Sequence, residues 1–166
     1  MEMALRVQER AFRRLPLVDA WQLQFASGTR GRYKFLVLNG QSQTGKTRFA
    51  RALVGDADRV WYCDCVAGTP DLRGFSKHSF DLIIYDELGP GCAVALKKLL
   101  QSGNDTCLLG VSPTMQFAYQ VVAHGVRQVI CTNVWAAELK LLPSADREWL
   151  ELNSVFAQVD APLWES

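Results

Sequence analysis

Residues 33–47 read YKFLVLNGQSQTGKT, in which an apolar run leads directly into a glycine-containing turn. An apolar run that ends in glycine is typical of a buried β-strand. Residues 40–47, GQSQTGKT, match the phosphate-binding pattern G-x-x-x-x-G-K-[ST] at every fixed position. The stretch therefore predicts a strand and a phosphate-binding loop, and the following TRFARAL (47–53) predicts a helix.

Each fixed position of this loop has a chemical reason. Backbone N–H groups can wrap a phosphate closely only where glycine leaves room, and the helix N-terminus adds partial positive charge. We expect Lys46 to reach the β- and γ-phosphates from a solvent-facing position and the Thr47 hydroxyl to hold Mg²⁺. The expected nucleotide-binding residues are the whole loop: Gly40, Gln41, Ser42, Gln43, Thr44, Gly45, Lys46 and Thr47.

A second group of polar residues closes the apolar run SFDLIIYDE, residues 79–87. This run predicts a buried strand that delivers Asp86 and Glu87 to its carboxyl end, where ligands bind in open α/β sheets. We expect Asp86 to take part in the Mg²⁺ shell and Glu87 to polarise the attacking water, with Asp86 as the next candidate for that role. Asn133 ends the strand VICTN (129–133) and could orient the water or contact the γ-phosphate, although such an amide taken alone is more often a strand cap.

The rest of the pattern predicts an α/β fold with a mainly parallel sheet covered by helices on both faces. Strands are expected at 33–40, 59–65, 79–87, 106–112 and 126–133, a helix at 92–101, helical structure around 134–152 and a short strand at 154–159. Two helices are expected before the first strand, one over 3–14 and one beginning at Pro16. Leu17, Trp21 and Phe25 fall four residues apart on the second of these, so we expect residues 1–30 to form a helical collar that joins subunits and residues 31–166 to form the nucleotide-binding domain.

Composition excludes several classes of protein. The chain has 166 residues and a net charge of +1, and its 49% apolar and 21% charged residues are typical of a globular domain. No apolar run approaches the roughly 18 residues of a membrane span, and the N-terminal sequence MEMALRVQERAFRR lacks the apolar core of a signal peptide, so we expect an intracellular protein. The five cysteines have no scaffold spacing and predict reduced thiols.

Charge is distributed unevenly along the chain. Residues 1–51 carry ten Lys/Arg against three Asp/Glu, a net of +7, and residues 52–166 carry eight against fourteen, a net of −6. This asymmetry fits a basic face for phosphates or nucleic acid and an acidic remainder that could complement a neighbouring copy; solvated arginines on a helix would account for it as well.

The order GQSQTGKTRFARAL, IIYDE and VICTN resembles the Walker A, Walker B and motif C series of superfamily 3 helicases. It is most similar to the replication initiator (Rep) of geminiviruses and other circular single-stranded DNA viruses, and the tail WLELNSVFAQVDAPLW (149–164) is similar to the end of geminivirus Rep. The resemblance implies an AAA+-like P-loop ATPase that uses ATP and Mg²⁺, forms a ring of identical subunits such as a hexamer, and moves along single-stranded DNA in the 3′-to-5′ direction, in the nucleus. It also implies an arginine finger, best matched by Arg147 and next by Arg127; from the residues alone, Arg147 could instead pair with Glu151.

The chain also departs from this family. It has no His-hydrophobic-His motif and no Tyr-x-x-x-Lys motif, so we expect a helicase domain that does not nick DNA by that route. The family carries a lysine on a hairpin before motif C, whereas here Arg127 is the only cation between Lys98 and Lys140. The leading hypothesis is a Rep-like ATPase and helicase domain, and the alternative is a nucleotide-binding assembly module that does not unwind DNA. A small-molecule kinase ranks below both, because residues 99–126 contain none of the arginines that a kinase lid requires.

Overall fold

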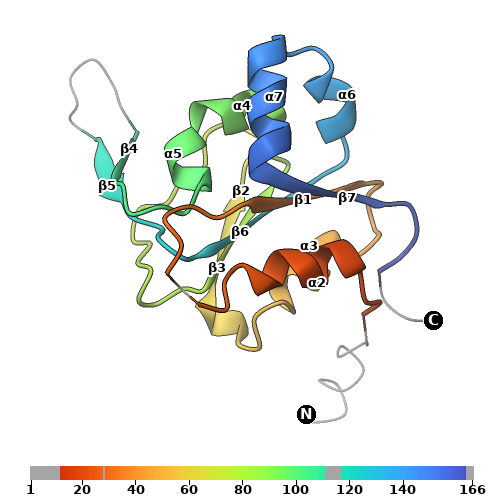
Figure 1. Ribbon diagram of the computed structural model, residues 1–166, viewed down its shortest axis with the longest axis horizontal. Coiled ribbons are helices and arrows are strands. Elements are labelled where there is room, and N and C mark those ends of the chain that lie inside the picture. The colour runs from red at the N-terminus through yellow and green to blue at the C-terminus, as the bar shows by residue number, and fades with distance from the viewer. Residues whose placement is uncertain (1–11, 28, 111–116, 164–166) are drawn as a thin grey trace.

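A computed structural model describes residues 12–27, 29–110 and 117–163, and these residues form a sheet with helices on both faces (Figure 1). The sheet has five strands in the order β2-β3-β6-β1-β7, and every neighbouring pair is parallel. The strands are β1 (Phe35–Gly40), β2 (Val60–Asp64), β3 (Leu82–Asp86), β6 (Arg127–Thr132) and β7 (Ser154–Val159). The predicted α/β class and mainly parallel sheet are therefore confirmed.

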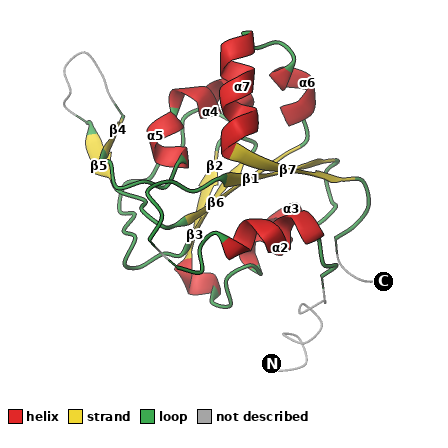
Figure 2. Ribbon diagram, viewed as in Figure 1, coloured by secondary structure: helices red, strands yellow, loops and turns green. Residues whose placement is uncertain are grey.

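The helices form a layer on each face of the sheet (Figure 2). One layer contains α2 (Pro16–Leu23) and α3 (Lys46–Arg51), and the other contains α4 (Pro90–Ala95), α5 (Lys97–Leu100), α6 (Trp135–Leu139) and α7 (Ser144–Asn153). A short 3-10 turn, η1 (Ala57–Arg59), leads into β2. No helix in the described ranges is long and apolar enough to cross a membrane.

Side chains of the central strands alternate between two apolar cores, one under each helical layer. In β1, Phe35 and Val37 pack in the core that contains residues of α4 to α7, and Leu36 and Leu38 pack in the core that contains residues of α2 and α3. A strand of a parallel sheet that is covered on both faces needs apolar side chains at every position. Residues 35–38 accordingly carry no polar side chain.

The helix predicted to begin at Pro16 is confirmed, with the proline in its first turn. Its predicted apolar stripe divides in two: Trp21 and Phe25 are buried against the sheet, whereas Leu17 is 56% exposed. The Trp21 indole N–H also donates to the Lys34 carbonyl oxygen at 2.6 Å. These two aromatic side chains are thus covered by their own chain and are not available to a neighbouring subunit. The helix predicted over residues 3–14 falls mostly outside the described residues, and residues 12–14 are not helical.

Two predicted elements differ from the structure. The helix expected at 92–101 is divided at Leu96, where ψ is 26°, into α4 and α5. Both parts keep buried residues on one side, so the apolar period does not reveal the break. The strand expected at 106–112 does not join the main sheet; β4 (Cys107–Leu109) pairs antiparallel with β5 (Tyr119–Val121) as a separate projecting hairpin (Figure 1). An apolar run does not specify its pairing partner, and here the partner is β5.

Candidate functional site

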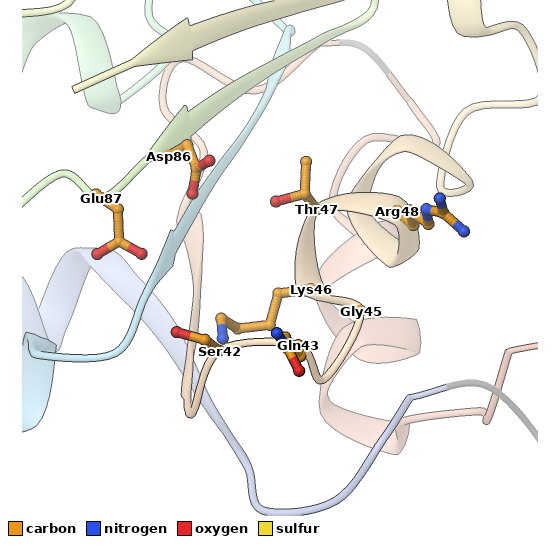
Figure 3. Close-up of a pocket in the computed structure, with 8 residues that line it drawn as sticks. All are labelled: Ser42, Gln43, Gly45, Lys46, Thr47, Arg48, Asp86 and Glu87. Carbon is orange, nitrogen blue, oxygen red and sulfur yellow. The ribbon is translucent and has the colours of Figure 1, made fainter. Parts of the chain in front are cut away.

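The strand order creates a cavity at the carboxyl edge of the sheet. The 40–47 loop leaves β1 and leads into α3, while the Asp86–Glu87 pair ends β3, and β6 lies between the two strands. The cavity has a volume of about 350 Å³ (Figure 3). Its lining residues are Ser42, Gln43, Gly45, Lys46, Thr47, Arg48, Asp86 and Glu87. Two motifs that lie far apart in the sequence therefore face a common space.

Lys46 lies in the wall of this cavity. Its Nζ donates to the carbonyl oxygens of Gly40 at 2.8 Å and Gln41 at 2.6 Å, and its side chain curls under the loop (Figure 3). Only 8% of the residue is exposed, so the prediction of a solvent-facing lysine is wrong. Burial lowers the pKa of the Lys46 ammonium, and the nearby Glu87 and Asp86 carboxylates oppose that shift. The positive charge therefore lies within the loop, with loop carbonyls as its partners.

Thr47 and Asp86 approach the cavity from opposite sides. Figure 3 shows the Thr47 hydroxyl directed toward the Asp86 carboxylate, across the space that the loop borders. Hydroxyl and carboxylate oxygens are ligands that Mg²⁺ prefers, and Mg²⁺ is usually held by one or two such groups together with phosphates. Within the described residues no group of three or more His, Cys, Asp or Glu forms a metal cage. The donor set therefore fits a phosphate-bound Mg²⁺ ion and does not fit an all-protein metal centre.

Cys131, on β6, lies near this donor pair. It is 1% exposed, and burial raises its pKa to about 12, so the thiol stays neutral. Lys46 and Thr47 lie close enough to oppose that shift. Cys131 is thus an uncharged core residue close to Lys46 and Thr47.

Glu87 has an unusual backbone conformation. Its φ angle is 62°, in the left-handed region that non-glycine residues rarely adopt, and its N–H donates to the Cys131 carbonyl oxygen at 2.7 Å. Such a conformation costs about 1–2 kcal/mol, and strained residues of this kind cluster at functional sites. Burial, followed by the Asp86 charge, raises the pKa of Glu87. The left-handed turn directs the carboxylate into the cavity after the strand has ended (Figure 3).

Gly40 has a packing role in addition to its place in the motif. A Cβ atom at this position would lie 2.1 Å from the carbonyl oxygen of Val159 in the neighbouring strand β7. Gly45 differs, because its φ of 85° requires the left-handed conformation that glycine adopts without strain. The two glycines of the motif are thus needed for different physical reasons.

Asn133 lines a neighbouring cavity instead of the one that contains Lys46. This second cavity, of about 540 Å³, shares Ser42 and Gln43 with the first. Its lining residues are Asn39, Gly40, Gln41, Ser42, Gln43, Asn133 and Gln158. Asn39 makes two hydrogen bonds at this cavity. Its side-chain amide donates to Gln158 Oε1 at 2.9 Å, and its Oδ1 accepts from the Trp135 backbone N–H at 3.0 Å. Asn133 therefore lies beside the phosphate-loop motif, although not against Asp86 or Glu87.

The two arginine candidates lie away from the cavity of their own chain. Arg147 is on α7, in the helical layer opposite α3, and lines an apolar hollow with Trp135 and Leu150. No ion pair with Glu151 is formed there. Arg127 begins β6, at the opposite edge of the sheet from the loop; its guanidinium lies 4.8 Å from the centre of the Phe25 ring and donates to Gln22. These intrachain contacts disfavour Arg127 as a group offered to a neighbour.

Tyr62 is a site residue that the sequence motifs do not reveal. Its hydroxyl donates a hydrogen bond to Asp86 Oδ2 from the adjacent strand β2. Burial, together with this hydrogen bond, raises the pKa of the Tyr62 phenol, so it stays protonated and able to donate. Only the β2–β3 register brings the two residues together, 24 positions apart in the chain.

No protein-family model matches this chain, and the comparison with curated proteins gives no match.

Proposed function

We propose that the protein binds ATP with Mg²⁺ at the 40–47 loop and hydrolyses it, as a Rep-like helicase domain of the superfamily 3 type. One observation carries the ATPase part of this proposal. The cavity brings together a phosphate-loop motif, a buried lysine and two carboxylates at the carboxyl edge of a parallel sheet, where ligands of such sheets bind.

The residues of the chain divide the work of phosphoryl transfer. The loop N–H groups and Lys46 bind the phosphates. To do so, the Lys46 ammonium gives up its hydrogen bonds to the Gly40 and Gln41 carbonyl oxygens and donates to phosphate oxygens. Thr47 and Asp86 would hold Mg²⁺ and its waters, and the ion would supply positive charge beside the phosphates. Glu87 orients and polarises the attacking water, a role favoured by its raised pKa and its direction into the cavity.

The helicase part of the proposal rests on the resemblance of the motif series to superfamily 3. In this proposal identical subunits form a ring, Arg147 reaches the nucleotide of a neighbour, and single-stranded DNA is the partner.

A specific observation favours the second candidate, a nucleotide-binding assembly module without unwinding activity. The β4–β5 hairpin precedes β6, as the family's DNA-gripping hairpin precedes motif C, yet residues 107–121 contain no Lys or Arg.

The ATPase proposal is tested with a fluorescent ATP analogue and a phosphate-release assay. Lys46→Ala is expected to abolish nucleotide binding, because Lys46 is the one lysine among the described residues that line the cavity. Glu87→Gln is expected to keep nucleotide binding and lower turnover at least 100-fold, since only the water-polarising step needs the charge. Lys34→Ala, which removes an exposed lysine just before β1, is the matched control and should behave as wild type. Unchanged ATP affinity in Lys46→Ala would contradict the proposal.

The two candidate functions are separated by adding DNA. A helicase domain should hydrolyse ATP faster with single-stranded DNA and displace a strand from a duplex with a 3′ single-stranded tail. An assembly module should bind ATP and increase in native mass, with no response to DNA.

A further inference from the structure

The Tyr62 hydroxyl occupies one oxygen of the carboxylate that faces Thr47. Tyr62 pairs in register with Ile84, and Asp86 lies two residues beyond Ile84 on the same face of β3. The phenol therefore reaches along this face and donates to Asp86 Oδ2. The other carboxylate oxygen, Oδ1, accepts no hydrogen bond from the described residues and is left for a metal ion or its waters.

The Arg51 side chain lies over the Tyr62 ring. Its guanidinium carbon lies 5.3 Å from the centre of the Tyr62 ring, within the distance of a cation–π contact. Arg51 is the last residue of α3, the helix whose first residues are Lys46 and Thr47. Tyr62 is thus in contact with both halves of the cavity, the α3 side that carries Thr47 and the β3 side that carries Asp86.

We propose that Tyr62 is a positioning residue for the metal site: its hydroxyl orients the Asp86 carboxylate so that Oδ1 faces Mg²⁺, and its ring, held by Arg51, couples that carboxylate to α3. This inference rests on the proposed function, because it concerns the same nucleotide-bound metal. A carboxylate at a strand end can rotate about its side-chain torsions, and a fixed hydrogen bond on one oxygen removes that freedom. Tyr62 acts through Asp86 and does not itself contact the phosphates.

The hydrogen bond from Tyr62 to Asp86 could also hinder metal binding. The two interpretations predict opposite changes in metal affinity when the hydroxyl is removed. If the Tyr62 hydroxyl competed with the metal for Asp86, removing it would strengthen metal binding. If it orients Asp86, removing it weakens metal binding, and the loss of such an outer partner typically lowers metal affinity about 10–100-fold. The sign of the change therefore decides between the two.

The test uses Tyr62→Phe, which removes the hydroxyl and keeps the ring against Arg51. Two readouts besides turnover follow the metal: the affinity for fluorescent ADP with EDTA and with increasing Mg²⁺, and Mn²⁺ binding in the presence of ADP by electron paramagnetic resonance. Tyr33→Phe is the matched control, because its hydroxyl accepts from the Arg30 N–H at the opposite edge of the sheet. Arg51→Met, which keeps the aliphatic stem and loses the charge, tests the coupling to α3.

Tyr62→Phe is expected to bind metal-free ADP within about twofold of wild type while its Mn²⁺ affinity falls about tenfold. Arg51→Met should shift metal affinity in the same direction by about threefold, and Tyr33→Phe should shift neither measurement. Unchanged or tighter metal binding in Tyr62→Phe, with metal-dependent nucleotide binding intact in wild type, would overturn this inference and leave the proposed function standing. A wild-type protein that binds no nucleotide with or without metal would overturn both.

Discussion

Replacing Gly40 by alanine tests the strand arrangement that builds the cavity. The added Cβ would lie 2.1 Å from the Val159 carbonyl oxygen, whereas carbon and carbonyl oxygen normally approach to about 3.3 Å. Strand β7 would therefore have to move by about 1 Å at its end. Crowding of this kind costs about 1–3 kcal/mol, and the loss of a terminal ladder hydrogen bond adds about 1 kcal/mol. We expect Gly40→Ala to lower the free energy of unfolding by about 3 kcal/mol.

The assay is thermal unfolding followed by circular dichroism, without nucleotide. For a chain of 166 residues, about 3 kcal/mol corresponds to a fall in Tm of about 6–12 °C. Gly55→Ala is the matched control, because a Cβ there meets no atom within 4 Å; its stability should change by less than about 1 kcal/mol. A Tm of Gly40→Ala within about 2 °C of wild type would show that β7 does not pack against β1 in this register. Because no ligand is present, the result is independent of any role of Gly40 in phosphate binding.

Three further predictions address electrostatics, burial and assembly. The Arg59 guanidinium donates to Asp81 at 2.6 Å and lowers the pKa of that carboxyl below 3.8, so its stabilisation is present above about pH 3.8 and is lost as pH falls through the folded pKa. The two side chains are 37% and 42% exposed, so Asp81→Asn should lower the free energy of unfolding by less than about 1 kcal/mol in urea at pH 7. The difference in this free energy between variant and wild type should shrink at pH 3. A difference that stays constant with pH would refute the prediction. At pH 7.5 iodoacetamide should alkylate the exposed Cys92 alone, giving one adduct by mass spectrometry, since the other four cysteines are buried; rapid multiple labelling would contradict that burial. If subunits share sites, Arg147→Ala should lower turnover without weakening ATP binding, and mixing this variant with Glu87→Gln should restore some activity. Wild-type turnover per subunit should rise with protein concentration. A concentration-independent rate from a monomer would argue against the ring.

Local sequence patterns were sufficient to predict most of the sheet. The runs at 33–40, 79–87 and 126–133 are buried strands because they cross the interior between two helical layers, which demands apolar side chains on both faces. The phosphate-loop motif and the Asp86–Glu87 pair lie at strand ends, and the carboxyl ends of parallel strands share one edge of a sheet. Their common cavity was therefore predictable without any contact between them being known.

The failed predictions concern features that a short window does not contain. The motif predicts a solvent-facing Lys46, but two loop carbonyl oxygens accept hydrogen bonds from its ammonium and allow its burial. The 106–112 run has the apolar composition of a sheet strand, yet β4 pairs with β5 outside the main sheet, and an apolar run does not specify its pairing partner. The apolar stripe of α2 predicts a buried face and does not state which surface covers it; in the structure the sheet of the same chain covers Trp21 and Phe25.

The sequence by itself determined the class of the fold, the position of the loop and the residues proposed to bind phosphate and metal, because periodicity, glycine spacing and side-chain chemistry are local properties. The tertiary structure alone decided which residues meet. It placed β6 between β1 and β3, joined Asn39 to Gln158 across 119 positions, and set Tyr62 against Asp86. Strand order and register depend on pairing between distant segments, and many pairings are compatible with the same apolar period. The choice among them is made by the packing of the whole domain, which no short stretch of the chain contains.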